Sequence, residues 1–347
     1  MRRAMAAGVV LALCCAAWAE GEKPKTQDEA VKQKLEETKV SFVFAEQPLT
    51  EVLDYLGTVG EINVALDDRA VADPNAVVTL KLTNASLGTA LELAVKQAAL
   101  RAGIVEGVVL VSSEEGIKRT REEVAALRRR IEKIKGVKEP DGLAKADGEV
   151  VKELEETKAS ISFIRQPIGE VWEYLGTVGQ VNLVADPRKY GKDETLTLKL
   201  ANVPIALWTT LAADQLGLRC AIGGGVVFIS DEKGAARWEA EAGEIAMSAE
   251  ERKTPAGEGM RKALMEKRVG FAFHDQPIVE AVKYLETAGG VKIVGPGEEY
   301  KDKKVTVRLR GVPLGTAIKL VVEQAGLKYE VKDGVVVIEK AEEKAEK

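Results

Sequence analysis

The chain has 347 residues with a formal net charge of −5, and 30% of the residues are charged while 46% are hydrophobic. This composition is typical of a globular protein, and the length predicts two or three domains. Aromatic residues make up only 5%, and no strongly basic stretch occurs. The sequence therefore argues against an extended phosphate-binding or base-stacking surface, and we expect no nucleic-acid partner.

The N-terminus has the pattern of a secretory signal peptide at residues 1–19. Arg2 and Arg3 precede an apolar segment at 4–17, and residues 17–19 read Ala-Trp-Ala, which fits the small-x-small cleavage rule. The apolar segment is too short to span a bilayer. We therefore expect cleavage after this tripeptide, a periplasmic or secreted mature protein, and no membrane span within it.

The cysteines bear on export and on stability. Leu13 stands before Cys14 where a lipoprotein signal requires a small residue, so lipid anchoring at Cys14 is the less favoured alternative. Outside the signal peptide only Cys220 remains, so no internal disulfide is expected. Because Ala102 and Tyr329 hold its place in the other copies of a repeat described next, we interpret Cys220 as a strand filler rather than a reactive thiol.

One sequence unit occurs three times. FAEQPLTEVLDYLGTVG at 44–60 returns as FIRQPIGEVWEYLGTVG at 163–179 and as FHDQPIVEAVKYLETAG at 273–289. The spacing between copies is too long for a solenoid repeat and suits a small domain followed by a linker. The repeated structural motif is the pair Gln47-Pro48, Gln166-Pro167 and Gln276-Pro277.

Each copy begins with a short strand of alternating pattern, followed by an amphipathic helix. Apolar residues after the Gln-Pro pair recur with helical spacing, as at Leu49, Val52 and Leu56, which predicts one buried stripe. Because proline lacks an N–H and presets φ, we expect it at the first helical position. The strands are predicted at 40–44, 160–163 and 269–273.

The rest of each copy contains two more strands, a second helix and a closing hairpin. The last strand is almost wholly apolar, so we expect it to be central or well covered. The second strands are predicted at 62–66, 181–185 and 291–294, the third at 77–82, 195–200 and 305–309, and the last at 108–111, 226–229 and 335–338. The fold class that follows is α+β, with three tandem βαββαββ domains that each place two helices on one face of a small sheet.

Charged segments separate the copies and define the predicted domain boundaries. Residues 114–135 have apolar residues at helical spacing, including Val124, Leu127 and Ile131, which predicts an exposed or partner-packed helix, whereas 136–148 resembles a flexible stretch. The predicted division is 1–19 signal peptide, 28–113 domain 1, 114–148 charged helical linker, 149–231 domain 2, 232–259 flexible linker, 260–340 domain 3 and 341–347 disordered tail.

The order of these elements resembles the short N-terminal domain of secretins and TonB-dependent receptors, the STN family. The third copy carries the fullest motifs, FHDQPIVEAVKYLETAGGVKIV followed by VTVRLRGVPLGTAIKLVVEQAGLKYEVKDGVVVI, and the other copies match nearly as well. The resemblance implies periplasmic modules that dock to partner proteins through strand edges or ring packing. The chain departs from the family because no secretin gate or receptor barrel follows Ile338, so we expect only the docking function to carry over.

Residues that could carry chemistry are not shared by all copies. His274 precedes Asp275, but Ala45 and Ile164 hold the place of the histidine elsewhere, so we do not expect it to be catalytic or to bind a metal. We therefore predict no catalytic residue, no metal site and no cofactor.

Two other polar or glycine-rich stretches have structural explanations. Asp67 and Asp68 form a carboxylate pair of which Asp186 repeats only one member, and Pro296 holds that place in copy three, so we interpret the position as a turn. Gly223–Gly225 lacks the lysine and the helix of a phosphate-binding loop, and we interpret it as a hairpin turn.

The Gln-Pro glutamine and the tryptophans complete the candidates. We expect the glutamine side chain to bond to the backbone at the strand–helix junction rather than to a ligand. Trp172 lies in the predicted core stripe. Trp238 lies in the predicted flexible linker, which makes it a candidate anchor for a partner. The sequence does not identify the partner-binding residues.

The leading hypothesis is a non-enzymatic multivalent docking scaffold or adaptor. Its partners would be other envelope proteins, in a secretin-type secretion or outer-membrane transport system. The alternative is a self-associating, homo-oligomeric ring-forming structural protein with the helix at 114–135 as its assembly element. Ligand or glycan binding between modules is disfavoured by the low aromatic content, and an enzyme comes last.

Overall fold

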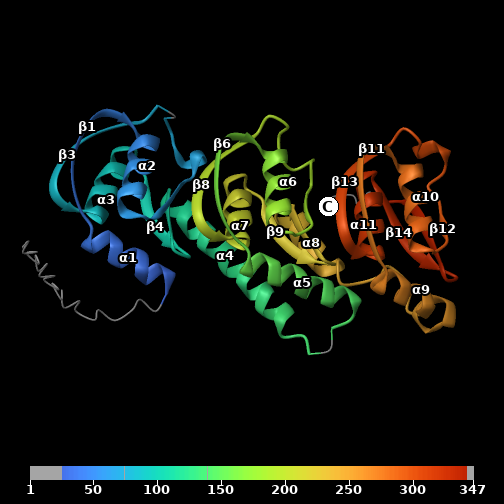
Figure 1. Ribbon diagram of the computed structural model, residues 1–347. Coiled ribbons are helices and arrows are strands. Elements are labelled where there is room, and N and C mark those ends of the chain that lie inside the picture. The colour runs from blue at the N-terminus through green and yellow to red at the C-terminus, as the bar shows by residue number, and fades with distance from the viewer. Residues whose placement is uncertain (1–25, 74, 139, 342–347) are drawn as a thin grey trace, which may run out of the picture.

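The computed structural model describes residues 26–73, 75–138 and 140–341, and it has the predicted α+β fold. Three small units of one design follow one another in a row (Figure 1). We call them unit 1 (27–112), unit 2 (142–230) and unit 3 (255–340). The predicted signal peptide with Cys14 and the tail from residue 342 onward lie outside the described residues.

Unit 1 illustrates the design. A capped helix comes first, and the predicted βαββαββ order follows it. The elements are α1 (Gln27–Glu37), β1 (Lys39–Pro48), α2 (Leu49–Gly60), β2 (Asn63–Leu66), β3 (Val77–Ser86), α3 (Leu87–Gln97), β4 (Arg101–Val105) and β5 (Val108–Ser112), with a short 3-10 turn η1 (Asp68–Ala70) before β3.

The strands form two small sheets rather than the single sheet that we expected. β1 pairs antiparallel with β3, whereas β5 is the centre of a three-stranded sheet, parallel to β2 and antiparallel to β4. β1 and β3 run four residues beyond the predicted ends, to Pro48 and Ser86, because bulges let the antiparallel pairing continue.

Units 2 and 3 repeat the design element by element, including the paired sheets. Unit 2 contains α5 (Gly142–Glu156), β6 (Lys158–Pro167), α6 (Ile168–Val178), β7 (Leu183–Ala185), β8 (Thr195–Pro204), α7 (Ile205–Gln215), β9 (Arg219–Gly223) and β10 (Val226–Ser230). Unit 3 contains α9 (Pro255–Glu266), β11 (Arg268–Pro277), α10 (Ile278–Gly289), β12 (Ile293–Val294), η3 (Glu298–Tyr300), β13 (Lys304–Pro313), α11 (Leu314–Gln324), β14 (Leu327–Lys332) and β15 (Val335–Lys340).

The segments between units are helical and packed. The predicted helix at 114–135 is confirmed as α4 (Glu114–Lys135), which Ser113 caps. The expected flexible stretches are wrong in part. α5 begins at Gly142, and the second linker contains α8 (Glu232–Glu241) and η2 (Glu251–Lys253). Charged composition hid α8, whose buried Ala235 and Trp238 belong to the core of unit 3, and the first turns of α5, where Leu143 packs into that same core.

The Gln-Pro motif has a different role from the one expected. Each proline is the last strand residue and the N-cap of the next helix, with ψ between 131° and 134°, so the helix begins one residue later than predicted. The amide of Gln47 donates to the Glu51 side chain rather than to the backbone, and the other copies repeat the bond. The motif is therefore Gln-Pro-x-x-Glu, and the carboxylate lies in the first helical turn, where the helix dipole favours it.

A carboxylate in or just before the first helix of each unit holds the turn of that unit's closing hairpin. The N–H of Gly107 donates to Asp28 and that of Gly225 donates to Asp147, both at 2.7 Å, while Gly334 donates to Glu251 at 2.8 Å. Polar contacts therefore tie the closing hairpin of each unit to its first helix or, in unit 3, to η2 just before that helix, which the sequence pattern did not reveal.

Candidate docking surfaces

The three-stranded sheet of each unit has one face that we call its sheet face, and in unit 1 this face packs on unit 2. Val109 and Val111 of β5 belong to the core of unit 1, whereas the alternate residues Val108 and Leu110 belong to the core of unit 2. A strand alternates its side chains between two faces, so β5 serves both cores. This confirms the prediction that the apolar last strand is well covered.

Unit 2 uses the same arrangement toward unit 3. Val227 and Ile229 of β10 face the core of unit 2, while Val226 and Phe228 belong to the core of unit 3. The apolar cores are therefore continuous across both junctions, and burial of both faces of β5 and β10 holds the units together.

At both junctions, an asparagine at the edge of the sheet face makes the same pair of hydrogen bonds. Asn63 accepts from the N–H of Ala201 at 2.7 Å and donates to its carbonyl at 3.0 Å. Asn182 makes the same two bonds, with the same distances, to Arg310. Ala201 and Arg310 lie at bulges where the ladder with the partner strand skips them, so their backbone groups are free to take the amide.

An ion pair accompanies each asparagine. Asp54 of α2 lies 2.7 Å from the ammonium of Lys199 on β8, and Glu173 of α6 lies 3.4 Å from the guanidinium of Arg308 on β13. These are equivalent positions of successive units, so the two junctions use one interface twice. Both pairs are exposed and contribute little affinity, but they favour one orientation of docking.

The helices between units add a third contact at each junction. Arg119 of α4 lies 2.7 Å from Asp214 of α7 and 3.3 Å from the buried Asp67 of unit 1. The hydrogen bond to Asp214 raises the pKa of Arg119. Asp67 also accepts from Ser112, so this carboxylate is part of the junction as well as the cap of η1. The turn interpretation of Asp67 was therefore incomplete.

The second junction has the same pair and a larger apolar anchor. Arg237 of α8 lies 3.3 Å from Glu323 of α11, at the positions equivalent to Arg119 and Asp214. Trp238 is 1% exposed, stacks on Phe228 and donates its ring N–H to a backbone carbonyl. The prediction that Trp238 anchors a partner is therefore wrong, because this side chain is buried inside the chain.

Unit 3 lacks the residues that make these contacts on its sheet face. Lys283 stands where units 1 and 2 have the acid, and Lys292 stands where they have the asparagine. On β14, Glu330 and Lys332 replace small or apolar residues and pair with each other at 3.3 Å. Pro296 replaces the buried aspartate. The sheet face of unit 3 is thus charged, while Val335 and Val337 at its centre stay half-buried.

Unit 1 carries the docking residues on its sheet face, but no other unit of the described chain covers its opposite surface. We call the surface that each unit turns toward the preceding unit its receiving face, built from the two-stranded sheet and the second helix. Lys81 and Thr83 of β3 are exposed at the positions of Lys199 and Ala201. Leu93 of α3 is 37% exposed, whereas its equivalents Leu211 and Leu320 are 2% and 3% exposed because another unit covers them. This receiving face is therefore open among the described residues.

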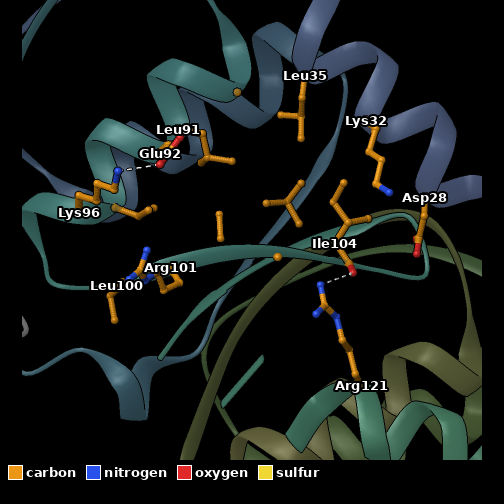
Figure 2. A pocket seen from close by; sticks show the side chains of 15 residues that line it. Asp28, Lys32, Leu35, Leu91, Glu92, Lys96, Leu100, Arg101, Ile104 and Arg121 are labelled. Atoms are coloured by element: carbon orange, nitrogen blue, oxygen red, sulfur yellow. Dashed lines mark hydrogen bonds and ion pairs between the residues drawn. The ribbon is translucent and has the colours of Figure 1, made fainter. Parts of the chain in front are cut away.

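A groove beside this face is also open in unit 1 (Figure 2). We call it the linker groove; its volume is about 540 Å³, and Leu35 and Ile104 point into it between α1, α3 and β4. In unit 2 the equivalent space is about 170 Å³ and has Leu127 of α4 in its wall. In unit 3, Ile245 packs at the same place, close to Gly315.

The charge of the linker groove differs between units. Lys96 of α3 stands where units 2 and 3 have the acids Asp214 and Glu323 that bind the linker arginines. Lys96 pairs with Glu92 at 2.6 Å, and Arg121 reaches the carbonyl of Ile104 from α4 (Figure 2). A helix that docked here with an arginine at the equivalent position would therefore meet a lysine.

The remaining sequence candidates do not assemble into a reaction centre. His274 is exposed and lines a groove of about 830 Å³ between units 2 and 3, together with Asp186 and Arg308. Burial raises and the Arg188 guanidinium lowers the pKa of Asp186, and the net shift is downward. Within 26–73, 75–138 and 140–341, no three His, Cys, Asp or Glu side chains gather as a metal site.

Cys220 and Gly223–Gly225 behave as structural elements. The Cys220 thiol donates to the carbonyl of Thr209, and desolvation raises its pKa, which suits a packed thiol rather than a nucleophile. Gly223–Gly225 forms the end of β9 and the turn to β10, as predicted. Among the described residues, no helix is both long and apolar enough to cross a membrane.

No family model matches the sequence, and searches of curated proteins and of solved structures return no significant match either. The resemblance to the STN family therefore stays a prediction that rests on the motifs of the three copies.

Proposed function

We propose that the protein is a non-enzymatic scaffold that docks other proteins of the bacterial envelope, with the periplasm as its location. The observation that carries the proposal is the repeated junction, in which an apolar strand face, an asparagine and an ion pair recur between units. The acid and the asparagine of these surfaces are present in units 1 and 2 and replaced by lysine in unit 3, so the surfaces differ in what they can bind.

The arrangement supports a stack of fixed order rather than modules on long tethers. Linker helices α4 and α8 pack between units, so each unit presents its remaining surface at a set distance from the others. A scaffold of this kind gains avidity when its partners match that spacing, because the second contact is intramolecular.

The ring-forming alternative has less support. Val124, Leu127 and Ile131 of α4 are buried against unit 2 of the same chain, so this stripe is already occupied. Closure of a ring through the repeated interface would bring Lys283 of one copy against Lys81 of the next, and like charges disfavour that contact.

The proposal is tested by affinity capture from an envelope extract on the immobilised full chain, followed by reconstitution with the purified candidate. We expect a protein that binds again in pure form and is displaced by free chain. In parallel, a thermal-shift screen with metabolites and glycans should give no stabilisation. A small-molecule hit together with no reconstituted partner would contradict the proposal.

A further inference from the structure

We propose that the open receiving face of unit 1 binds the sheet face of a related module on a different polypeptide. This inference rests on the proposed docking function and names the surface and the chemistry of the partner. The same contact is made twice inside the chain, where the sheet face of one unit covers the receiving face of the next. Unit 1 has the same receiving face, but no sheet face among the described residues covers it.

The receiving face of unit 1 has the residues that this contact requires. Lys81 offers the cation that the acid of a preceding unit binds, and Thr83 lies at the β3 bulge where an asparagine would find a backbone N–H and carbonyl. Leu93 supplies the apolar contact that is covered in the other units, and Val43 beside Lys81 is 67% exposed. Leu93 is therefore an exposed apolar side chain on a face where its equivalents are covered, as expected of an interface.

A second copy of this chain does not fit as the occupant. The sheet face that a copy could offer belongs to unit 3, and it carries Lys283 and Lys292 in place of the acid and the asparagine. Lys283 would approach Lys81, and the long charged side chains of Glu330 and Lys332 would stand where residues of units 1 and 2 are small or apolar. Charges at these positions act against self-association, as polar caps do at the ends of repeat proteins.

The partner that fits has four features. Its sheet face carries a central apolar strand, an asparagine at the edge strand and a carboxylate positioned to meet Lys81. Its linker helix carries an acid or a neutral residue where α4 and α8 have arginine, because Lys96 replaces the acid in the linker groove. This charge pattern distinguishes the partner from units 1 and 2 themselves.

The test gives the chain a sheet face that fits its own unit 1. The donor variant is Lys283→Glu, Lys292→Asn, Glu330→Ala and Lys332→Val, which copies the residues of units 1 and 2. Sedimentation velocity over a range of concentrations should show the wild type as a monomer and the donor variant as concentration-dependent head-to-tail oligomers.

Two further substitutions in unit 1 test whether the donor variant associates through the receiving face of that unit. In the donor variant, the added change Leu93→Glu should weaken self-association more than about tenfold, because it puts a charge into the apolar contact. Lys81→Glu should weaken it by roughly threefold to tenfold, as expected for reversal of an exposed ion pair. Both residues are exposed, so these variants should fold, which circular dichroism checks.

A second variant with fewer substitutions keeps the test valid if the donor variant misfolds. Lys283→Glu with Lys292→Asn changes only exposed side chains and should give the same association at higher concentration. If both variants stay monomeric while folded, the proposal is overturned. It is also overturned if the wild type forms head-to-tail oligomers, because a second copy would then be the occupant. Association of the donor variant without any captured envelope partner would support the face while the docking function fails.

Discussion

The sheet faces of units 2 and 3 have the same strand order but opposite chemistry. In unit 2, both faces of β10 are buried, and Asn182 with Glu173 binds the next unit. In unit 3, β15 is covered on one face, and Lys292 and Lys283 occupy the equivalent positions. The fold tolerates both sets, so Asn182 and Glu173 serve docking rather than folding.

The largest effect should come from the apolar anchor of the second junction. Trp238→Ala should lower the free energy of unfolding by about 3–5 kcal/mol, because a fully buried indole leaves a cavity between units 2 and 3. The equivalent residue at the first junction is Thr120, which donates to Asp214 at 2.5 Å. Thr120→Ala should cost about 1–2 kcal/mol, and urea unfolding measures both. Equal costs would show that the two junctions are not anchored differently.

The hairpin turn of unit 2 should make stability depend on pH. Burial raises the pKa of Asp147 to about 6, although the N–H of Gly225 opposes this shift. Between the ordinary value of 3.8 and about 6 the folded state binds more protons than the unfolded state, so stability falls as pH rises. The cost at pH 7 is at most about 3 kcal/mol.

Asp147→Asn tests this dependence, because the amide oxygen can still accept from Gly225. We expect the variant to be more stable than the wild type at pH 7 and to have no advantage at pH 4, measured by urea unfolding. A difference that does not change between these pH values would show that Asp147 is not the source.

The asparagine contact gives a direct comparison between units. Asn182→Ala should cost about 1–2 kcal/mol, because two backbone hydrogen bonds at Arg310 are lost. Lys292→Ala, at the same position of unit 3, should change stability by less than about 0.5 kcal/mol. A similar cost at both positions would mean that the asparagine acts within its own unit.

The ion pairs should have the smallest effect. Lys199→Ala and Arg308→Ala should each cost about 0.2–1 kcal/mol, since the pairs with Asp54 and Glu173 are exposed. The cost should shrink when unfolding is measured at high salt. A cost that salt does not change would point to lost packing of the long side chains instead.

The repeat made most of the fold predictable from the sequence. Three copies of the same apolar spacing located the helices after the Gln-Pro pairs, and the apolar runs at 108–111 and 226–229 indicated strands covered on both sides. α4 was predicted with its observed ends because Val124, Leu127 and Ile131 keep helical spacing.

The docking surfaces were harder to predict because their residues are single polar positions. Asn63 and Asn182 were visible in the sequence, but nothing local indicates that their amides bind a strand of another unit. Trp238 was misplaced because no local pattern shows that its ring stacks on Phe228 of β10 and lies under Lys319 of unit 3. A comparison of the three copies would have found the interface. The Asn, Asp and Glu that units 1 and 2 carry there are replaced by Lys or Pro in the third copy.

Shared apolar cores fix the three units in one ordered row. Small-angle X-ray scattering of the wild-type chain over a range of concentrations tests this arrangement. We expect a monomer whose curve fits the single arrangement of Figure 1 at every concentration. A curve that requires an ensemble of freely tethered units, or a mass that corresponds to a closed ring, would contradict it.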